Sequence, residues 1–191
     1  MVYRFHLYSR RLLQLLFGFD RWHVSTFRER KYAVDIVEHL NRCENIAGQK
    51  VVEIGCGLGD IIRRIKSPTK EGLDYDLKVC RAAIFIGRIV RDNTKYYQFR
   101  FPDNSLTSVY DIIIMVNWIH HIEPDVLKSQ IETLFQNNLN SQGKILIDTV
   151  FDRQYRFNHD VNFLTSSLDC RVDIIAADKR QRQIFSINKI N

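Results

Sequence analysis

Three glycines at alternate positions, Gly55, Gly57 and Gly59, are the first residues of the sequence whose type and spacing could support chemistry. They follow the short apolar segment 50–54, which we expect to form a β-strand. A residue without a side chain lets the backbone approach a ligand closely, so we expect the amides of these glycines to face a ligand. A tight turn between a strand and a helix also needs glycine, and the three glycines alone therefore do not define a binding site.

An acidic residue at the end of the next predicted strand makes the pattern more specific. Asp74 lies nineteen positions after Gly55 and ends the predicted strand 71–74. A carboxylate at this place in an α/β sheet can accept hydrogen bonds from both hydroxyls of an adenosine ribose, so the pattern indicates a ligand that contains a nucleoside. The dinucleotide pattern G-x-G-x-x-G would place its third glycine at Asp60, which argues against a nicotinamide cofactor.

Residues 53–59, EIGCGLG, match the pattern E/D-x-G-x-G-x-G. With this motif, Asp74 and the segment NWIHHI at 117–122, the sequence over roughly residues 30–150 resembles the class I S-adenosylmethionine-dependent methyltransferases. The resemblance implies a Rossmann-like fold, S-adenosylmethionine (SAM) as the cofactor, and methyl transfer as the activity.

The resemblance also implies roles for single residues. Asp74 would hold the ribose, and Tyr75 would lie beside the adenine. Glu53 would lie close to the methionine amino group, or it would instead cap amides of the neighbouring loop. Asn117, after the fourth strand, would lie near the methionine part of the cofactor. The full set of implied cofactor-binding residues is Glu53, Gly55, Cys56, Gly57, Gly59, Asp74, Tyr75 and Asn117.

One departure from the family follows the third predicted strand. Many members carry an acid there that contacts the adenine amino group, whereas this sequence reads KYYQFRFPDNS and has no acid at the matching place. We expect backbone groups near Gln98 and Phe99 to take that part.

Two neighbouring histidines, His120 and His121, are the candidate catalytic residues. Methyl transfer to an oxygen acceptor requires loss of a proton, and an imidazole near the site is a suitable base. Adjacent residues cannot both point into one site equally well. Each histidine could also be satisfied by backbone hydrogen bonds and have no catalytic part.

The elements that must position these residues can be predicted from periodicity. The almost continuously apolar run 111–117, DIIIMVN, predicts a central parallel strand covered on both faces. The other predictions are helices at 29–40, 77–91 and 124–139, a short helix from about Gly59 that ends before Pro68, strands at 96–99 and 144–150, and a hairpin of 171–176 with 183–188 around the polar turn 178–182. This order predicts an α/β fold, a Rossmann-like and mostly parallel seven-stranded sheet flanked by helices, with a C-terminal antiparallel hairpin.

The length of 191 residues predicts a single domain, in which residues 1–45 form a helical cap and residues 46–191 the Rossmann-like core. Four widely separated cysteines form neither a C-x-x-C pair nor a metal-binding spacing, so we expect no metal site and a reducing, cytoplasmic location. The apolar stretch 12–19 is too short for a transmembrane helix and lacks the features of a signal peptide. It predicts an amphipathic segment that docks on the protein itself or on a membrane surface.

The methyl acceptor is not determined by these motifs. The net charge of +6 is compatible with a solvated basic surface or with acidic partners. The segment FGFDRWH at 17–23 is similar to segments of bacterial methyltransferases associated with surface-glycan biosynthesis, and it makes Trp22, His23 and Arg28 candidates for a cap over the acceptor. The segment 151–169 either lines the same pocket or forms an ordinary surface connection.

We therefore expect a small molecule or a sugar or glycan precursor as substrate, methylated at an oxygen. An RNA acceptor is an alternative, against which stand the lack of an added RNA-binding domain and of an N-P-P-Y motif. A non-catalytic methyltransferase-like protein that binds a partner is another.

Overall fold

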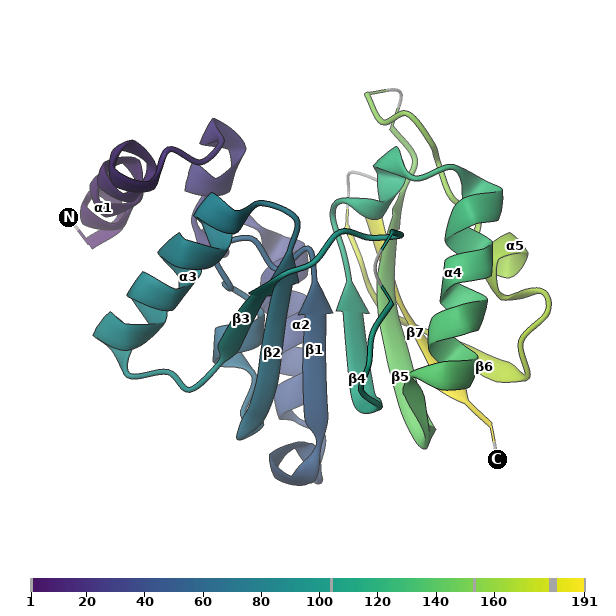
Figure 1. The fold of residues 1–191 in the computed structure, drawn as a ribbon. Helices are drawn as coiled ribbons and strands as arrows, with labels where there is room; N and C mark the ends of the chain where they lie inside the picture. Colours follow the sequence, from purple (N-terminus) through teal and green to yellow (C-terminus); the bar gives the residue numbers. More distant parts are fainter. Residues whose placement is uncertain (1, 104, 153, 179–181, 191) are drawn as a thin grey trace.

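Seven strands form one sheet in the order β3-β2-β1-β4-β5-β7-β6 (Figure 1). The computed structural model describes residues 2–103, 105–152, 154–178 and 182–190, with side chains from Ser9 onward. The strands are β1 (Lys50–Ile54), β2 (Thr69–Asp74), β3 (Lys95–Gln98), β4 (Tyr110–Met115), β5 (Leu139–Val150), β6 (Cys170–Ala177) and β7 (Arg182–Lys189). The first five strands of this order, from β3 to β5, are parallel to one another. Strand β7 pairs antiparallel with both β5 and β6. The predicted fold class is confirmed.

The described residues form five α-helices: α1 (Val2–Phe17), α2 (Lys31–Asn41), α3 (Leu77–Val90), α4 (Pro124–Asn137) and α5 (Val161–Thr165). Local chemistry explains two of their starting points. The Asp76 side chain accepts a hydrogen bond from the Lys78 amide at the start of α3, and Glu123 does the same for Val126 at the start of α4. Among the described residues, no helix is long and apolar enough to cross a membrane.

The central strand β4 explains how the two faces of the sheet are covered. Its side chains alternate in direction, and Ile112, Ile113, Ile114 and Met115 are all fully buried. Ile113 and Met115 pack in one core with α4 and α5. Ile112 and Ile114 pack in a second core with the apolar face of α2 and with Ala83 of α3. The predicted central strand covered on both faces is confirmed.

The predicted helix after Gly59 does not form, and only a single 3₁₀ turn, Ile62–Arg64, is present. Side chains take the hydrogen bonds that a helix would need. The Ile62 amide donates to the Glu53 carboxyl, and the carbonyls of Leu58 and Asp60 accept from the guanidinium groups of Arg63 and Arg64. These groups would otherwise pair along the helix, from residue i to i−4.

Smaller differences concern boundaries. Strand β5 begins at Leu139, earlier than the predicted Lys144, because Leu139 pairs with Tyr110 before a register shift. Helix α2 begins at Lys31 because the preceding residues form a 3₁₀ turn, Phe27–Glu29, closed by a capping box between Thr26 and Glu29. The C-terminal hairpin is confirmed, whereas residues 179–181 of its predicted turn lie outside the described residues.

A conservative change in β4 tests the central role of this strand. Ile113→Val should lower the free energy of unfolding by about 1 kcal/mol, because it leaves a methyl-sized gap in a fully buried position. Ile174→Val, on the edge strand β6, is the matched control, since Ile174 is 62% exposed and its change should stay within about 0.5 kcal/mol. Urea unfolding followed by circular dichroism measures both. Equal losses at the two positions would contradict the assignment of β4 to the core.

Candidate active site

The carboxyl ends of β1, β2 and β4 meet at one edge of the sheet, and a cavity of about 560 Å³ lies there. This volume lies within the range of small-molecule sites. We call it the Gly55 cavity. Its lining is largely aromatic and consists of Trp22, Ile54, Gly55, Asp74, Tyr75, Phe99, Phe101, Asn117, Trp118, His121, Ile122 and Tyr155. The cavity thus brings together Gly55, Asp74, Asn117 and His121, all of which were singled out in the sequence.

The three glycines of the motif have different surroundings. Gly55 lines the cavity at φ +74°, and a Cβ at this position would overlap the Trp118 indole. Gly57 faces His23, whose Nδ1 would lie 3.1 Å from an added Cβ. Gly59 faces the Tyr96 hydroxyl, which a Cβ would overlap. Only Gly55 of the three therefore borders the cavity, while the other two make room for side chains of the protein.

The prediction that the amides of these glycines face a ligand is wrong. The amides of Gly55 and Cys56 both donate to the Leu73 carbonyl oxygen, at 2.7 and 2.9 Å. The Gly57 amide donates to the Asp74 carboxylate at 2.8 Å, and the Gly59 amide donates to the Cys56 carbonyl. The buried Cys56 thiol contacts the Gly57 carbonyl and does not line the cavity. The loop is held to β2 by its own amides, and these are not free for a ligand.

Asp74 and Tyr75 lie side by side in the wall of the Gly55 cavity. The Asp74 carboxylate is 3% exposed and accepts hydrogen bonds from the amides of Gly57 and Asp76, at 2.8 and 3.1 Å. Burial raises the pKa of Asp74. Tyr75 is 55% exposed, so its ring is available to a planar group. The amide of Phe99, expected to serve the adenine, donates instead to the Asp74 carbonyl at 2.8 Å.

Glu53 is buried at the end of β1 and is 3% exposed. Its carboxyl accepts a hydrogen bond from the Ile62 amide at 3.0 Å. The alternative that Glu53 caps a loop amide is thus confirmed. Burial raises the pKa of Glu53 to about 8, so the carboxyl is mostly protonated at neutral pH. Its expected proximity to a methionine amino group stays a prediction.

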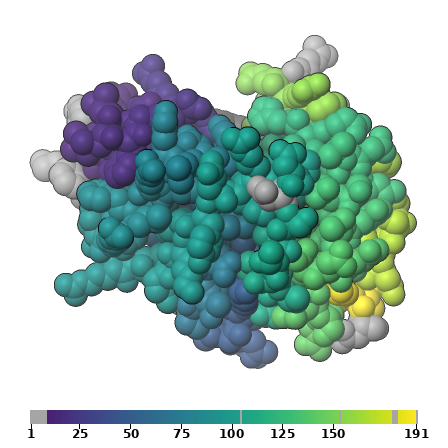
Figure 2. Space-filling model, in the orientation of Figure 1, coloured from purple at the N-terminus to yellow at the C-terminus, as the bar shows by residue number. Residues whose placement is uncertain are grey.

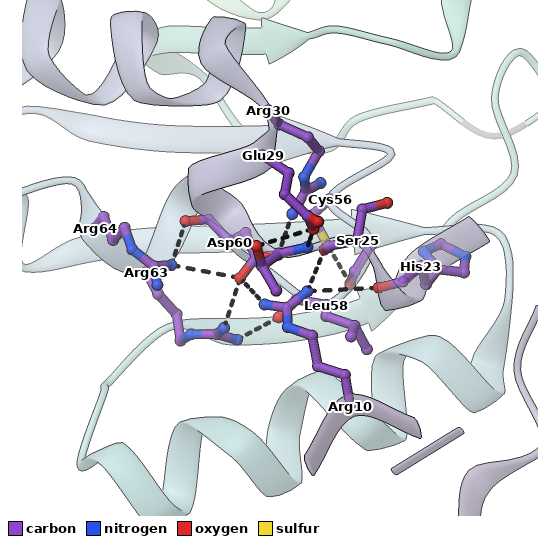
Figure 3. A network of polar contacts seen from close by, with 12 residues as sticks. Arg10, His23, Ser25, Glu29, Arg30, Cys56, Leu58, Asp60, Arg63 and Arg64 are labelled. Carbon is purple, nitrogen blue, oxygen red and sulfur yellow. Dashed lines mark hydrogen bonds and ion pairs between the residues drawn. The ribbon is translucent and has the colours of Figure 1, made fainter. Parts of the chain in front are cut away.

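Asp60, the residue after Gly59, is the centre of an ion cluster (Figure 3). The carboxylate is surrounded by the guanidinium groups of Arg10, Arg30, Arg63 and Arg64. Although burial alone would raise the pKa of Asp60, the neighbouring Arg30 and Arg10 hold it well below its usual range. Arg10 also donates to the Ser25 carbonyl at 2.7 Å. The cluster therefore joins α1 and the start of α2 to the glycine loop.

A second cavity, of about 890 Å³, adjoins the first, because the two share Trp22, Asn117 and Tyr155 as lining residues. We call it the Arg30 cavity. It is lined by side chains of both charge signs: Glu29, Arg30, Lys31, Asp60, Asp152, Asp178 and Arg182. His23 also lines it, and burial lowers the pKa of His23 to about 4, so its imidazole is neutral at pH 7. Such a lining suits a polar ligand with several hydrogen-bonding groups.

Asn117 lies between the two cavities in a left-handed conformation, φ 74°. The fully buried Asp148 carboxylate accepts a hydrogen bond from the Asn117 amide at 2.7 Å. Asp148 also pairs with the Arg182 guanidinium and lies 3.4 Å from His120 Nε2. Arg182 in turn donates to the Tyr155 hydroxyl at 3.2 Å. This network fixes the loop after β4.

The two candidate histidines occupy different environments. His121 lines the Gly55 cavity. His120 is fully buried, lines neither cavity, and packs beside the Tyr155 ring with the two ring centres 4.6 Å apart. Of the two imidazoles, only that of His121 borders the space that a ligand can reach.

Several site residues were missed from the sequence. Trp118 covers Gly55, and its Nε1 donates to the Ile54 carbonyl at 2.6 Å. Asp148 lies within the predicted strand 144–150, and an acid in an otherwise apolar strand was a usable signal. Arg182 and Tyr155 carried none, because they lie in polar segments that the fold brings to the site from far along the chain. Of the three cap candidates, Trp22 and His23 line the Arg30 cavity, whereas Arg28 lines neither cavity.

Comparison with solved structures relates this geometry to known proteins. DhpI in complex with SAH is 17% identical, the match covers 97% of this chain and 96% of DhpI, and the TM-score is 0.67. Magnesium protoporphyrin IX methyltransferase (ChlM) from Synechocystis PCC 6803, with bound SAM, is 14% identical over 91% of this chain and 86% of that one, with a TM-score of 0.70. No family model and no curated protein sequence matches the chain.

The chain has the class I methyltransferase fold. The similarity extends to a 16S rRNA N2 G1207 methyltransferase (RsmC) from T. thermophilus, in complex with AdoMet and guanosine, at 12% identity over 90% of this chain and 44% of that one, with a TM-score of 0.65. At such identities the methyltransferase fold is shared, while the acceptor of any one neighbour does not transfer to this chain.

The buried Glu53 gives this methyltransferase fold a testable pH dependence. Because the pKa is about 8 in the folded chain and 4.5 for an unperturbed glutamate, the unfolded chain loses its proton first as the pH rises. Glu53 therefore destabilises the fold progressively between about pH 5 and 8, by up to roughly 1.4 kcal/mol per pH unit. In Glu53→Gln this component should be absent, so the variant should gain stability over the wild type through that range.

Urea unfolding at half-unit pH steps measures the difference. Glu44→Gln, at an exposed position, is the matched control and should follow the wild type. If Glu53→Gln and the wild type keep parallel profiles from pH 5 to 8, the elevated pKa is wrong.

Proposed function

We propose that the protein is a SAM-dependent methyltransferase whose substrate is a small molecule or a sugar or glycan precursor, methylated at an oxygen. The observation that carries this proposal is the pairing of two adjoining cavities on the methyltransferase fold. One contains Asp74 and Tyr75, and the other is polar and shares Asn117 with it. Solved neighbours bound to SAM or SAH support the choice of cofactor.

The residues of the Gly55 cavity fit this cofactor. The Asp74 carboxylate can accept hydrogen bonds from ribose hydroxyls, and the exposed Tyr75 ring can stack on adenine. Gly55, Ile54 and Asn117 also line this cavity and would hold the methionine portion. When bound, SAM supplies a methyl group on a sulfonium, and the chain holds the acceptor in line with it and excludes water.

The Arg30 cavity is the proposed acceptor site. Its mixed charges and the neutral His23 favour a polar, hydroxyl-bearing molecule over a simple apolar one. His121, on the wall of the Gly55 cavity, is the proposed base that removes the acceptor proton. We assign to His120 a positioning role through its contacts with Asp148 and Tyr155.

Residues 1–45 act in this proposal as the cap, since Trp22, His23 and Arg30 all come from them. The four free cysteines of the chain support the proposed cytoplasmic location. An RNA acceptor is disfavoured by the several carboxylates of the Arg30 cavity, which would repel phosphates. A non-catalytic role is disfavoured because the Gly55 cavity keeps both Asp74 and Tyr75 in its lining.

Removing the charge of Asp74 should weaken cofactor binding. In Asp74→Asn the loss of charge-assisted hydrogen bonds to the ribose predicts a dissociation constant for SAH about 10- to 100-fold higher, measured by calorimetry. Asp76→Asn is the matched control, because this neighbouring acid caps α3 and lies outside the cavity lining. Unchanged affinity in Asp74→Asn would overturn the assignment of the cavity.

The two histidines should separate in their effects. His121→Ala should leave SAH affinity unchanged and lower the rate of methyl transfer about 10²- to 10⁴-fold, the usual contribution of a general base. His120→Ala should instead lower the melting temperature, because it empties a fully buried position. Rates are measured with labelled SAM and candidate sugars or nucleotide-sugars. Full activity of His121→Ala would remove it as the base.

A further inference from the structure

The outer faces of α1 and α3 carry apolar side chains that no part of the described chain covers. Leu12, Leu15 and Leu16 on α1 are 58, 82 and 66% exposed, and Phe85 and Ile89 on α3 are 42 and 65% exposed. The two helices lie together at one end of the molecule (Figures 1 and 2), and the rings of Phe17 and Phe85 are in contact across them, with centroids 5.7 Å apart. We call these exposed faces the α1–α3 surface.

Helix α1 is apolar on two sides. Leu13 and Phe17 pack with Ile86 of α3 in a small core, so the inner side of the helix is already occupied by the protein. Leu12, Leu15 and Leu16 are therefore not needed for that contact. A helix of a globular protein in water usually places polar residues on the side that faces away from the core. The second apolar side of α1 is left exposed by the rest of the described chain.

The charged residues within the two helices all have one sign, although Asp20 follows α1 and Asp76 precedes α3. Neither α1 nor α3 contains an Asp or Glu, whereas Arg11, Lys78, Arg81 and Arg88 are exposed on them. Within the described residues none of these four side chains forms an ion pair, although the chain forms many elsewhere. Arg10 is the exception on α1, because it turns inward to Asp60.

We propose that the α1–α3 surface binds an anionic lipid membrane, with the exposed leucines, Phe85 and Ile89 entering the interface and the four cationic side chains contacting lipid phosphates. Apolar side chains surrounded by Lys and Arg, without acids, are the pattern of helices that bind membrane interfaces. A second copy of the chain would bring the same cations against one another. A nucleic acid would match the charge but would make no use of exposed aliphatic side chains.

The surface is held in a defined relation to the proposed active site. Arg10 of α1 donates to the Ser25 carbonyl and to Asp60, and Trp22, three residues before Ser25, lines both cavities. A membrane bound to α1 would therefore lie at the same end of the chain as the cap. Membrane binding by this surface does not depend on methyl transfer.

Vesicle flotation tests it with the full chain. The wild type should float with vesicles of phosphatidylcholine that contain about 30% phosphatidylglycerol, and not with phosphatidylcholine alone. Leu15→Glu/Leu16→Glu should lose binding at least tenfold, and Arg81→Glu/Arg88→Glu should lose it by a similar factor. Val109→Glu/Val126→Glu and Arg42→Glu/Arg171→Glu are the matched controls, since they change the net charge of exposed positions elsewhere by the same amounts as the first and the second variant, and they should bind as the wild type does.

The outcomes are distinct, provided that the thermal melts of the variants agree with that of the wild type. The proposal is overturned if the wild type binds neutral and anionic vesicles equally, or if neither Leu15→Glu/Leu16→Glu nor Arg81→Glu/Arg88→Glu weakens its binding. A dimer seen by light scattering that Leu15→Glu/Leu16→Glu dissociates, without vesicle binding by the wild type, assigns the surface to a second copy. Retained binding of an RNA by Leu15→Glu/Leu16→Glu, again without vesicle binding by the wild type, assigns the charges to nucleic acid.

Discussion

The buried carboxylate of Asp60 and the arginines around it are the interaction on which the arrangement of the site depends. A carboxylate that is 3% exposed must be compensated, and the chain does so with four guanidinium groups drawn from α1, from the start of α2 and from the turn after the glycine loop. Arg10 also holds the Ser25 carbonyl, so the segment with Trp22 and His23 is fixed over the loop. Loss of one partner from such a buried cluster usually costs 3–5 kcal/mol, about half the stability of many domains.

Asp148 repeats this arrangement on the other side of the site. Its buried carboxylate pairs with the Arg182 guanidinium through one oxygen, and the other oxygen accepts a hydrogen bond from the Asn117 amide. Arg182 comes from the start of β7, so the C-terminal hairpin contributes to a loop that follows β4. Two buried carboxylates, each paired with arginine from a distant segment, thus close the site from both sides.

Periodicity predicted the sheet well because a buried strand requires a run of apolar residues, which is visible in the sequence. The run at 111–117 and the stripe of α3 have only one reasonable interpretation, and both are confirmed. The segment after Gly59 was misjudged because Glu53, Arg63 and Arg64 compete for its backbone groups, and no local pattern shows that competition. The sequence located the three glycines but did not show which of them borders a cavity. A nearby side chain such as that of Tyr96 requires a residue without a Cβ just as a ligand does. Arg182 and Tyr155 could not be placed without the topology of the hairpin.

Trp118 has a consequence for the strength of any ligand in the Gly55 cavity. Its indole lies against Gly55, and its N–H already uses the Ile54 carbonyl, a backbone acceptor at the end of β1. A ligand group that hydrogen-bonds to the same oxygen competes with a side chain at a very high local concentration. Its apparent affinity is then the intrinsic affinity multiplied by the fraction of molecules whose indole has moved aside. Trp118, itself part of the cavity wall, would in this way set the working concentration range of the site.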